Sequence, residues 1–179
     1  MRKRQLFLLL PLLLVVLFIG FFFVSVILSD DNIPSTLKEC YAELDLTLSD
    51  EEIDQIRNAG SGDLFRKSGL TDDRWNQLVA EGFDPVDLDL SSAHFGLGLW
   101  IRNNWIYPSP NTNIAIRFLV SGVNHPDDMS SMVVDGYYLY LNDLPYSIPI
   151  QAQAIVTYIV VVLILVSSIS FFIVSKHRK

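Results

Sequence analysis

Two blocks of the sequence contain side chains that could do chemistry. The first block runs from His94 to Trp105, and the second runs from His125 to Ser130. Imidazole and carboxylate groups are ligand types that divalent metal ions accept in proteins. A metal centre built from these blocks would use four residues, which are His94, His125, Asp127 and Asp128.

The same blocks also allow a purely structural interpretation. The spacing of these histidines and carboxylates is not that of a His-Glu-x-x-His motif or of another motif with a known geometry. Arg102 lies in the first block, and an ion pair with Asp127 or Asp128 would join the two blocks. Because buried charges are usually paired, we favour this structural clamp over a metal or catalytic site.

Other signals of enzymatic chemistry are absent from the sequence. There is no Gly-x-Ser-x-Gly motif of the kind that places a nucleophilic serine. Gly96-Leu-Gly98 lacks the third glycine and the preceding strand of a dinucleotide-binding loop. The sequence therefore identifies no catalytic residue and no cofactor, and it favours a role other than catalysis.

The two blocks resemble those of an uncharacterised bacterial domain-of-unknown-function family, whose members carry closely similar HFGLGxWIRNNW and HPDDMS signatures. The stretches Leu37–Asp45 and Leu48–Glu52 are similar to the start of that family. The resemblance would cover about residues 35–142, with a longer segment at 62–89 and a different continuation after Trp105. It implies a domain but no activity. The resulting candidate cluster, functional or structural, is His94, Gly96, Gly98, Trp100, Arg102, Asn103, Asn104, Trp105, His125, Asp127 and Asp128.

Helices must position these residues. Capping-box spacing at Thr36/Glu39 and Ser49/Glu52 predicts two helix starts, and Asn58-Ala59-Gly60 predicts the end of the second helix. Thr71 is expected to cap a helix over 72–81. Ser91 or Ser92 is expected to cap an apolar helix that continues to Trp105, and Gly96 and Gly98 within it predict close approach of another backbone or a ligand. Further helices are expected over 114–120 and from Pro126 onward.

Two long apolar runs enclose this central region. Leu6–Leu28 and Ala154–Val174 contain no charged residue, and each is long enough as a helix to cross a hydrocarbon core of about 30 Å. A cleaved signal peptide would have a shorter apolar stretch and a small residue before its cleavage site, so the first run predicts an uncleaved anchor. The runs define five segments: 1–5 cytoplasmic, 6–28 transmembrane, 29–153 extracytoplasmic, 154–174 transmembrane and 175–179 cytoplasmic.

Charge gives the orientation and the class of partner. Three Lys or Arg residues lie in each terminal segment, which predicts that both termini are cytoplasmic and that the central domain is periplasmic or extracellular. The central domain combines 20 Asp and Glu with the 7 remaining Lys and Arg, a net charge of −13. Such an acidic domain is not expected to bind nucleic acid.

The sequence therefore predicts a mainly α protein, with a compact helical extracytoplasmic domain between two transmembrane helices. We expect it to contact the lipid bilayer and to bind a protein partner, as an envelope component or an immunity-type protein. The alternative is a metal-dependent envelope hydrolase that uses His94, His125, Asp127 and Asp128. Cys40, the one cysteine, is expected to be a small buried residue. Neither the oligomeric state nor the identity of the partner follows from the sequence.

Overall fold

The computed structural model describes residues 33–108, 113–148 and 150–177. All regular elements in these ranges are helices, and no strand occurs among them. The prediction of a mainly α fold is confirmed. The predicted cytoplasmic N-terminus and first membrane helix lie outside the described residues, as do the side chains of 171–179 at the end of the second predicted span.

Two capped helices begin the described part of the chain. α2 spans Leu37–Thr47, and α3 spans Asp50–Arg57. Ser49 forms the expected capping box with Glu52 at the start of α3. At α2, the Thr36 side chain accepts from the backbone N–H of Glu39, but the Glu39 carboxylate accepts from Ser35 instead of Thr36. That predicted capping box is therefore half formed.

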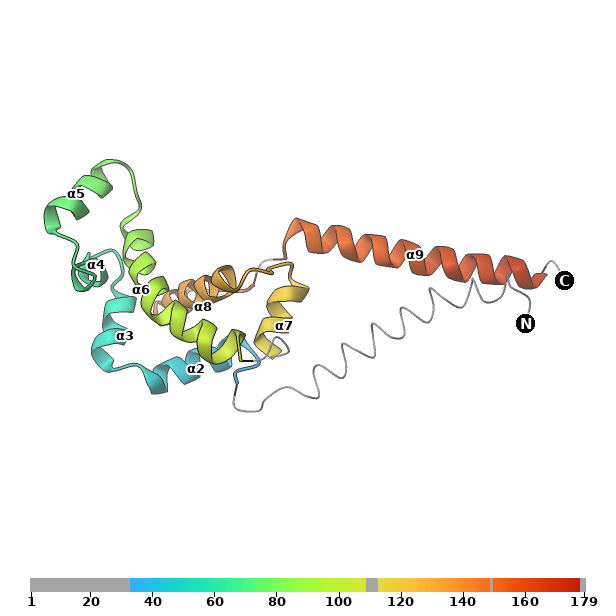
Figure 1. Ribbon diagram of the computed structural model, residues 1–179, viewed down its shortest axis with the longest axis horizontal. Coiled ribbons are helices and arrows are strands. Elements are labelled where there is room, and N and C mark those ends of the chain that lie inside the picture. Colours follow the sequence, from blue (N-terminus) through green and yellow to red (C-terminus); the bar gives the residue numbers. More distant parts are fainter. Residues whose placement is uncertain (1–32, 109–112, 149, 178–179) are drawn as a thin grey trace.

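Two short helices form an arm that projects beyond α3. α4 spans Asp63–Lys67, and α5 spans Asp72–Ala80 with Thr71 as the predicted cap. The sequence did not predict α4. Its N-cap is Gly62 in the left-handed region, at φ +84°, and no side chain of the cap residue marks its start. Figure 1 shows α4 and α5 at the end of the molecule that is farthest from α9.

The first signature block lies on a helix that begins earlier than predicted. α6 spans Pro85–Ile101 and continues into η1, a π-helical turn over Arg102–Ile106. The predicted caps Ser91 and Ser92 are wrong. The Asp84 side chain caps the helix by accepting from the N–H of Val86, with Pro85 at the first position. The hydroxyl of Ser91 donates to the Leu88 carbonyl within the helix.

The second block begins the helix that packs on α6. α7 spans Asn113–Val120 and α8 spans Pro126–Leu141, as expected. α6 and α8 form the central pair of the domain, with α2 and α3 against α8 and α7 against η1 (Figure 1). The core between them contains the fully buried side chains of Leu44, Ile101, Ile114, Phe118, Val133, Val134 and Tyr137.

One glycine of α8 lets a tyrosine from α2 approach closely. A Cβ built on Gly136 would lie 2.1 Å from the hydroxyl oxygen of Tyr41 and 2.6 Å from a ring carbon of Tyr146. Any larger residue at 136 would push these rings away. The neighbouring Cys40 is 0 % exposed, so the prediction of a buried cysteine is confirmed.

The last helix, α9, spans Ala152–His177 and extends away from the rest of the described chain (Figure 1). Its described side chains beyond Ala154 are largely exposed and apolar. Within the parts of the chain that the structure describes, no helix combines the length and the hydropathy needed to cross a membrane.

Candidate functional site

The structure joins the two signature blocks through one arginine. A terminal nitrogen of Arg102 lies 2.8 Å from the Asp127 Oδ1 and donates to the Ser130 Oγ at 3.1 Å. The Arg102 side chain is only 15 % exposed, and Ser130 is fully buried. The Ser130 hydroxyl in turn donates to the Asp127 carbonyl at 2.9 Å. The predicted ion pair between the blocks is confirmed, with Asp127 as the partner.

The histidines have separate partners. The Nε2 of His94 lies 3.1 Å from the Oδ1 of Asp135, which lies farther along α8 than Asp127. His125 is exposed and caps α8, where its Nδ1 accepts from the N–H of Asp127 at 3.3 Å. No group of three or more metal-ligating side chains gathers anywhere among the described residues. Asp128 is exposed in the first turn of α8 and borders a hollow that also contains Asp135.

The two glycines of the first block differ. Gly98 is buried, and a Cβ there would lie 3.5 Å from the Ser130 Oγ and 3.9 Å from an Arg102 nitrogen. Gly98 therefore packs at ordinary contact distance against side chains of the clamp, and no other backbone is among these nearest neighbours. At Gly96 no other backbone approaches closely, because a Cβ would meet nothing within 4 Å.

The aromatic and amide residues of the block stabilise the π turn. The rings of Trp100 and Trp105 meet edge to face, with their centroids 5.2 Å apart. The side-chain amide of Asn104 donates to the Trp100 carbonyl at 2.8 Å, while Asn103 is exposed. π turns inside α-helices often occur at functional sites. Here the turn buries Trp105 while it leaves both amides at the surface.

A buried carboxylate that the sequence did not single out lies earlier on α6. Asp89 is 0 % exposed, and its two oxygens accept from three backbone N–H groups: Gly60 at 2.7 Å, Gly62 at 2.8 Å and Phe65 at 3.2 Å. Gly60 and Gly62 both have positive φ, which turns their N–H groups toward one point. Asp89 therefore fixes the loop before α4 to the central helix. No sequence motif marks such a carboxylate, because its partners are backbone groups.

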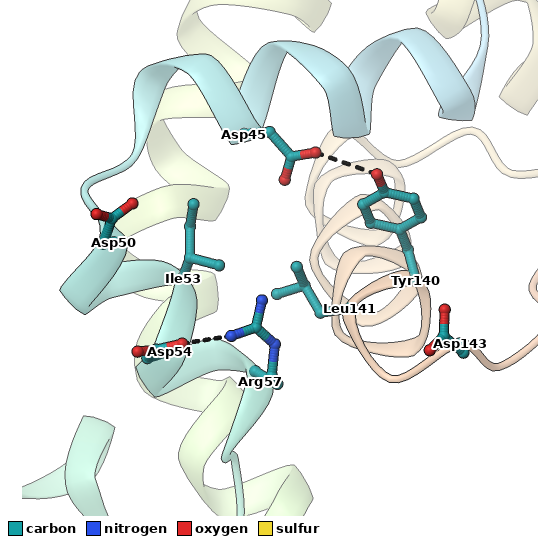
Figure 2. Close-up of a pocket in the computed structure, with 8 residues that line it drawn as sticks. All are labelled: Asp45, Asp50, Ile53, Asp54, Arg57, Tyr140, Leu141 and Asp143. Carbon is teal, nitrogen blue, oxygen red and sulfur yellow. Dashed lines mark hydrogen bonds and ion pairs between the residues drawn. The ribbon is translucent and has the colours of Figure 1, made fainter.

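Carboxylates also surround an open hollow between α2, α3 and the end of α8 (Figure 2). The hollow has a volume of about 580 Å³ and is lined by Asp45, Asp50, Ile53, Asp54, Arg57, Tyr140, Leu141 and Asp143. We call it the acidic hollow. Arg57 is its one lining cation, and it forms an ion pair with Asp54.

Two tyrosines position one carboxylate of the acidic hollow. The hydroxyl of Tyr137 donates to the Asp45 Oδ1 at 2.7 Å, and that of Tyr140 donates to the Oδ2 at 3.1 Å. Burial, followed by the bond to Asp45, raises the pKa of Tyr137. The bond to Asp45 also raises the pKa of Tyr140, so this hydroxyl is a weaker acid than that of an ordinary tyrosine. Asp45 is therefore a fixed wall of the hollow.

The middle of the chain matches one protein-family model. Residues 83–141 match the family model described as Domain of unknown function (DUF6794). This segment of the chain is similar to that uncharacterised family. No curated protein and no solved structure matches the chain.

The DUF6794 match contains both signature blocks and every residue of the Arg102 clamp. It begins at Phe83, so the expected extension of the resemblance back to residue 35 lies outside it. The signatures themselves and a bacterial origin stay predictions. The acidic hollow is built partly outside the DUF6794 segment, because α2 and α3 supply most of its carboxylates.

Proposed function

We propose that this chain is a membrane-anchored binding protein whose acidic central domain takes a basic segment of a protein partner. The two apolar runs would anchor it, with both termini cytoplasmic and the domain outside. An envelope component and an immunity-type protein that neutralises a basic toxin both fit this description. The observation that carries the proposal is the acidic hollow.

The surplus of negative charge on the surface supports a basic partner. Among the described residues, carboxylates that pair with a Lys or Arg side chain are those of Glu51, Asp54, Asp63, Asp72, Glu81 and Asp127. Asp50 and Asp143 in the hollow have no such partner among them. Two tyrosine hydroxyls already hold the carboxylate of Asp45 in place. It therefore loses little further conformational freedom when a Lys or Arg side chain binds.

The exposed apolar surface of α9 supports the anchor. Side chains from Ile155 to Ile169 are apolar at nearly every position, and most are about half exposed. A helix that is apolar on all sides is normally surrounded by apolar groups, either protein or lipid. In the sequence the apolar run continues to Val174 and is followed by three basic residues, as expected for the cytoplasmic end of a span.

A charge-matched pair of double variants tests the binding site. Asp50→Asn with Asp143→Asn removes two charges from the hollow, and asparagine is well tolerated at position 143, where φ is +56°. Asp73→Asn with Asp87→Asn removes two charges elsewhere: both are exposed first-turn acids without a cation partner among the described residues. The full chain in lipid nanodiscs is titrated with a lysine-rich peptide at about 0.15 M salt.

The hollow variant is expected to weaken peptide binding by about fivefold relative to the control variant, since each exposed charge contact is worth up to about 1 kcal/mol. An equal loss in the two variants would mean that the peptide responds only to net charge. That result, or no binding by the unmodified chain, would overturn the proposed site.

A further inference from the structure

The end of α7 is fastened to the first turns of α9. The backbone N–H of Gln151 donates to the Ser121 carbonyl at 2.7 Å, and the Tyr158 hydroxyl donates to the Val120 carbonyl. Figure 1 shows α7 beside the start of α9. Whatever environment surrounds the start of α9 is therefore also the environment of the end of α7.

A glycine makes this close approach possible. Gly122 follows α7 with φ +89°, and a Cβ there would lie 2.8 Å from the Cβ of Gln151 and 3.1 Å from the Cβ of Ala154. Ala154 is buried, although it lies at the start of an otherwise exposed helix. The contact between the two helices is thus a packed junction with a defined register.

The outward side of α7 is apolar, with one cation. Ile114, Ala115 and Phe118 face the core, while Leu119 and Val120 are 47 % and 44 % exposed. Arg117 is exposed beside them, and the structure gives it no ion pair within the described ranges. An adjoining hollow of about 500 Å³ is lined mainly by apolar side chains, together with Arg117 and two serines, Ser121 and Ser147.

We propose that this face of α7 lies on the outer leaflet of the membrane, a claim that rests on the proposed anchoring by α9. Leu119 and Val120 enter the boundary between headgroups and acyl chains, and the Arg117 guanidinium contacts lipid phosphate. A span that begins at Ala154 places Tyr158 about 6 Å along the helix axis, which is the depth of the interface. The bond from Tyr158 brings the Val120 carbonyl to that same depth.

The chemistry of these side chains fits a lipid surface. Tyrosine is enriched where a span meets the headgroups, because its ring is apolar and its hydroxyl is polar. An arginine beside apolar residues can lay its stem on the apolar surface and direct its charge to phosphate. The strongly acidic helix α3 lies at the far end of the domain from α9 (Figure 1).

Nitroxide spin labels measure these depths in the full chain. Single cysteines replace Leu119 on α7, Val162 within α9 and Phe83 between α5 and α6, three exposed positions of which Phe83 is the aqueous control. The native Cys40 is fully buried, and the unsubstituted chain measures its background labelling. Proteins are reconstituted in phosphatidylcholine vesicles, and collision of each label with oxygen is compared with collision with a water-soluble nickel complex.

The expected order of depth is Val162 deepest, Leu119 at the interface and Phe83 in water, and Val120→Cys should repeat the result for Leu119. A Leu119 label as accessible to nickel as the Phe83 label, with Val162 still deep, would overturn the α7 contact and leave the anchoring intact. A Val162 label in water would overturn the anchoring itself. A Leu119 label shielded from both reagents and broadened by a second label would mean that another copy of the chain covers this face.

Discussion

Two carboxylates on the central pair of helices illustrate different ways of holding one domain together. Asp89 on α6 is fully buried and is bound only by backbone N–H groups. Asp127 on α8 is 56 % exposed and is bound by the guanidinium of Arg102. Asp89 is shielded from water, so leaving its carboxylate without partners would cost much free energy. Asp127 is exposed, so water can replace much of the stabilisation that Arg102 provides. The free energy of unfolding should therefore depend far more on the bonds from backbone N–H groups to Asp89 than on the ion pair between Arg102 and Asp127.

Asp89→Ala should give the largest effect. It leaves three N–H groups without their acceptor and opens a void beside α4, so we expect a loss of about 4 kcal/mol in the free energy of unfolding. Asp89→Asn keeps one acceptor oxygen and should lose roughly half as much. Thermal unfolding of the full chain in detergent, followed by circular dichroism, measures both. A midpoint for Asp89→Ala equal to that of the unmodified chain would contradict the role given to this carboxylate.

Arg102→Met should come next, at about 1–2 kcal/mol. The methionine keeps much of the apolar stem against the helix pair, but it removes the bonds to Ser130 and Asp127. Ser130 keeps its own bond to the Asp127 carbonyl, which limits the loss. A loss as large as that of Asp89→Ala in the same thermal experiment would mean that the Arg102 clamp contributes as much to the free energy of unfolding as the buried Asp89.

Asp127→Asn should cost about 0.5 kcal/mol, because an exposed ion pair is worth little. The difference from the unmodified chain should shrink further in high salt, where the pair is screened. Asp128→Asn, in the same helix turn but without a cation partner in the described part of the chain, is the matched control for the effect of charge at the start of α8. Equal losses in the two variants would assign the effect to the helix dipole alone.

The smallest effect concerns an exposed capping box. Bonds from the backbone and hydroxyl of Ser49 lower the pKa of Glu52 below its ordinary value of 4.5. A lowered folded-state pKa gives stability that is present above about 4.5 and is lost as the pH falls through the lowered value. The difference in midpoint between the chain and Glu52→Gln should be constant from pH 5 to 7, approximately, and should shrink below 4.5. A difference in midpoint that grew on acidification would contradict the lowered pKa of Glu52.

The contrast between Asp89 and Asp127 also shows what the sequence could predict. Arg102 and Asp127 are charged side chains in two recognisable blocks, so their pairing followed from the general need of a buried cation for an anion. The start of α3 followed from Ser49 and Glu52, because a capping box is local. Asp89 could not be found in this way, since its partners are amides of a loop and of the first turn of α4, 24 to 29 residues earlier in the chain. The true start of α6 does have a local signal, because Asp84 caps the helix and Pro85 occupies its first position, but Ser91 and Ser92 resembled caps as well.

The acidic hollow marks a further limit. Of its carboxylates, only Asp50 lies in the first turn of a helix, and no sequence motif sets Asp45, Asp54 or Asp143 apart. Only the packing of α2 and α3 against the end of α8 brings Asp45, Asp50 and Asp143 around one concave surface (Figure 2). The residues that were most unusual in sequence belong to the DUF6794 segment and hold the helices together, while the surface proposed for binding comes from commonplace residues.

One paired measurement most directly tests whether the residues that hold the helices together are separate from the surface that binds a partner. Affinity for the lysine-rich peptide and thermal midpoint are measured side by side for Asp50→Asn/Asp143→Asn and for Arg102→Met, with the full chain in nanodiscs. We expect the hollow variant to lose affinity with little change in thermal midpoint, and the Arg102→Met variant to have a lower thermal midpoint with unchanged affinity. The reverse pattern, with peptide binding lost at Arg102 and retained in the hollow variant, would contradict it.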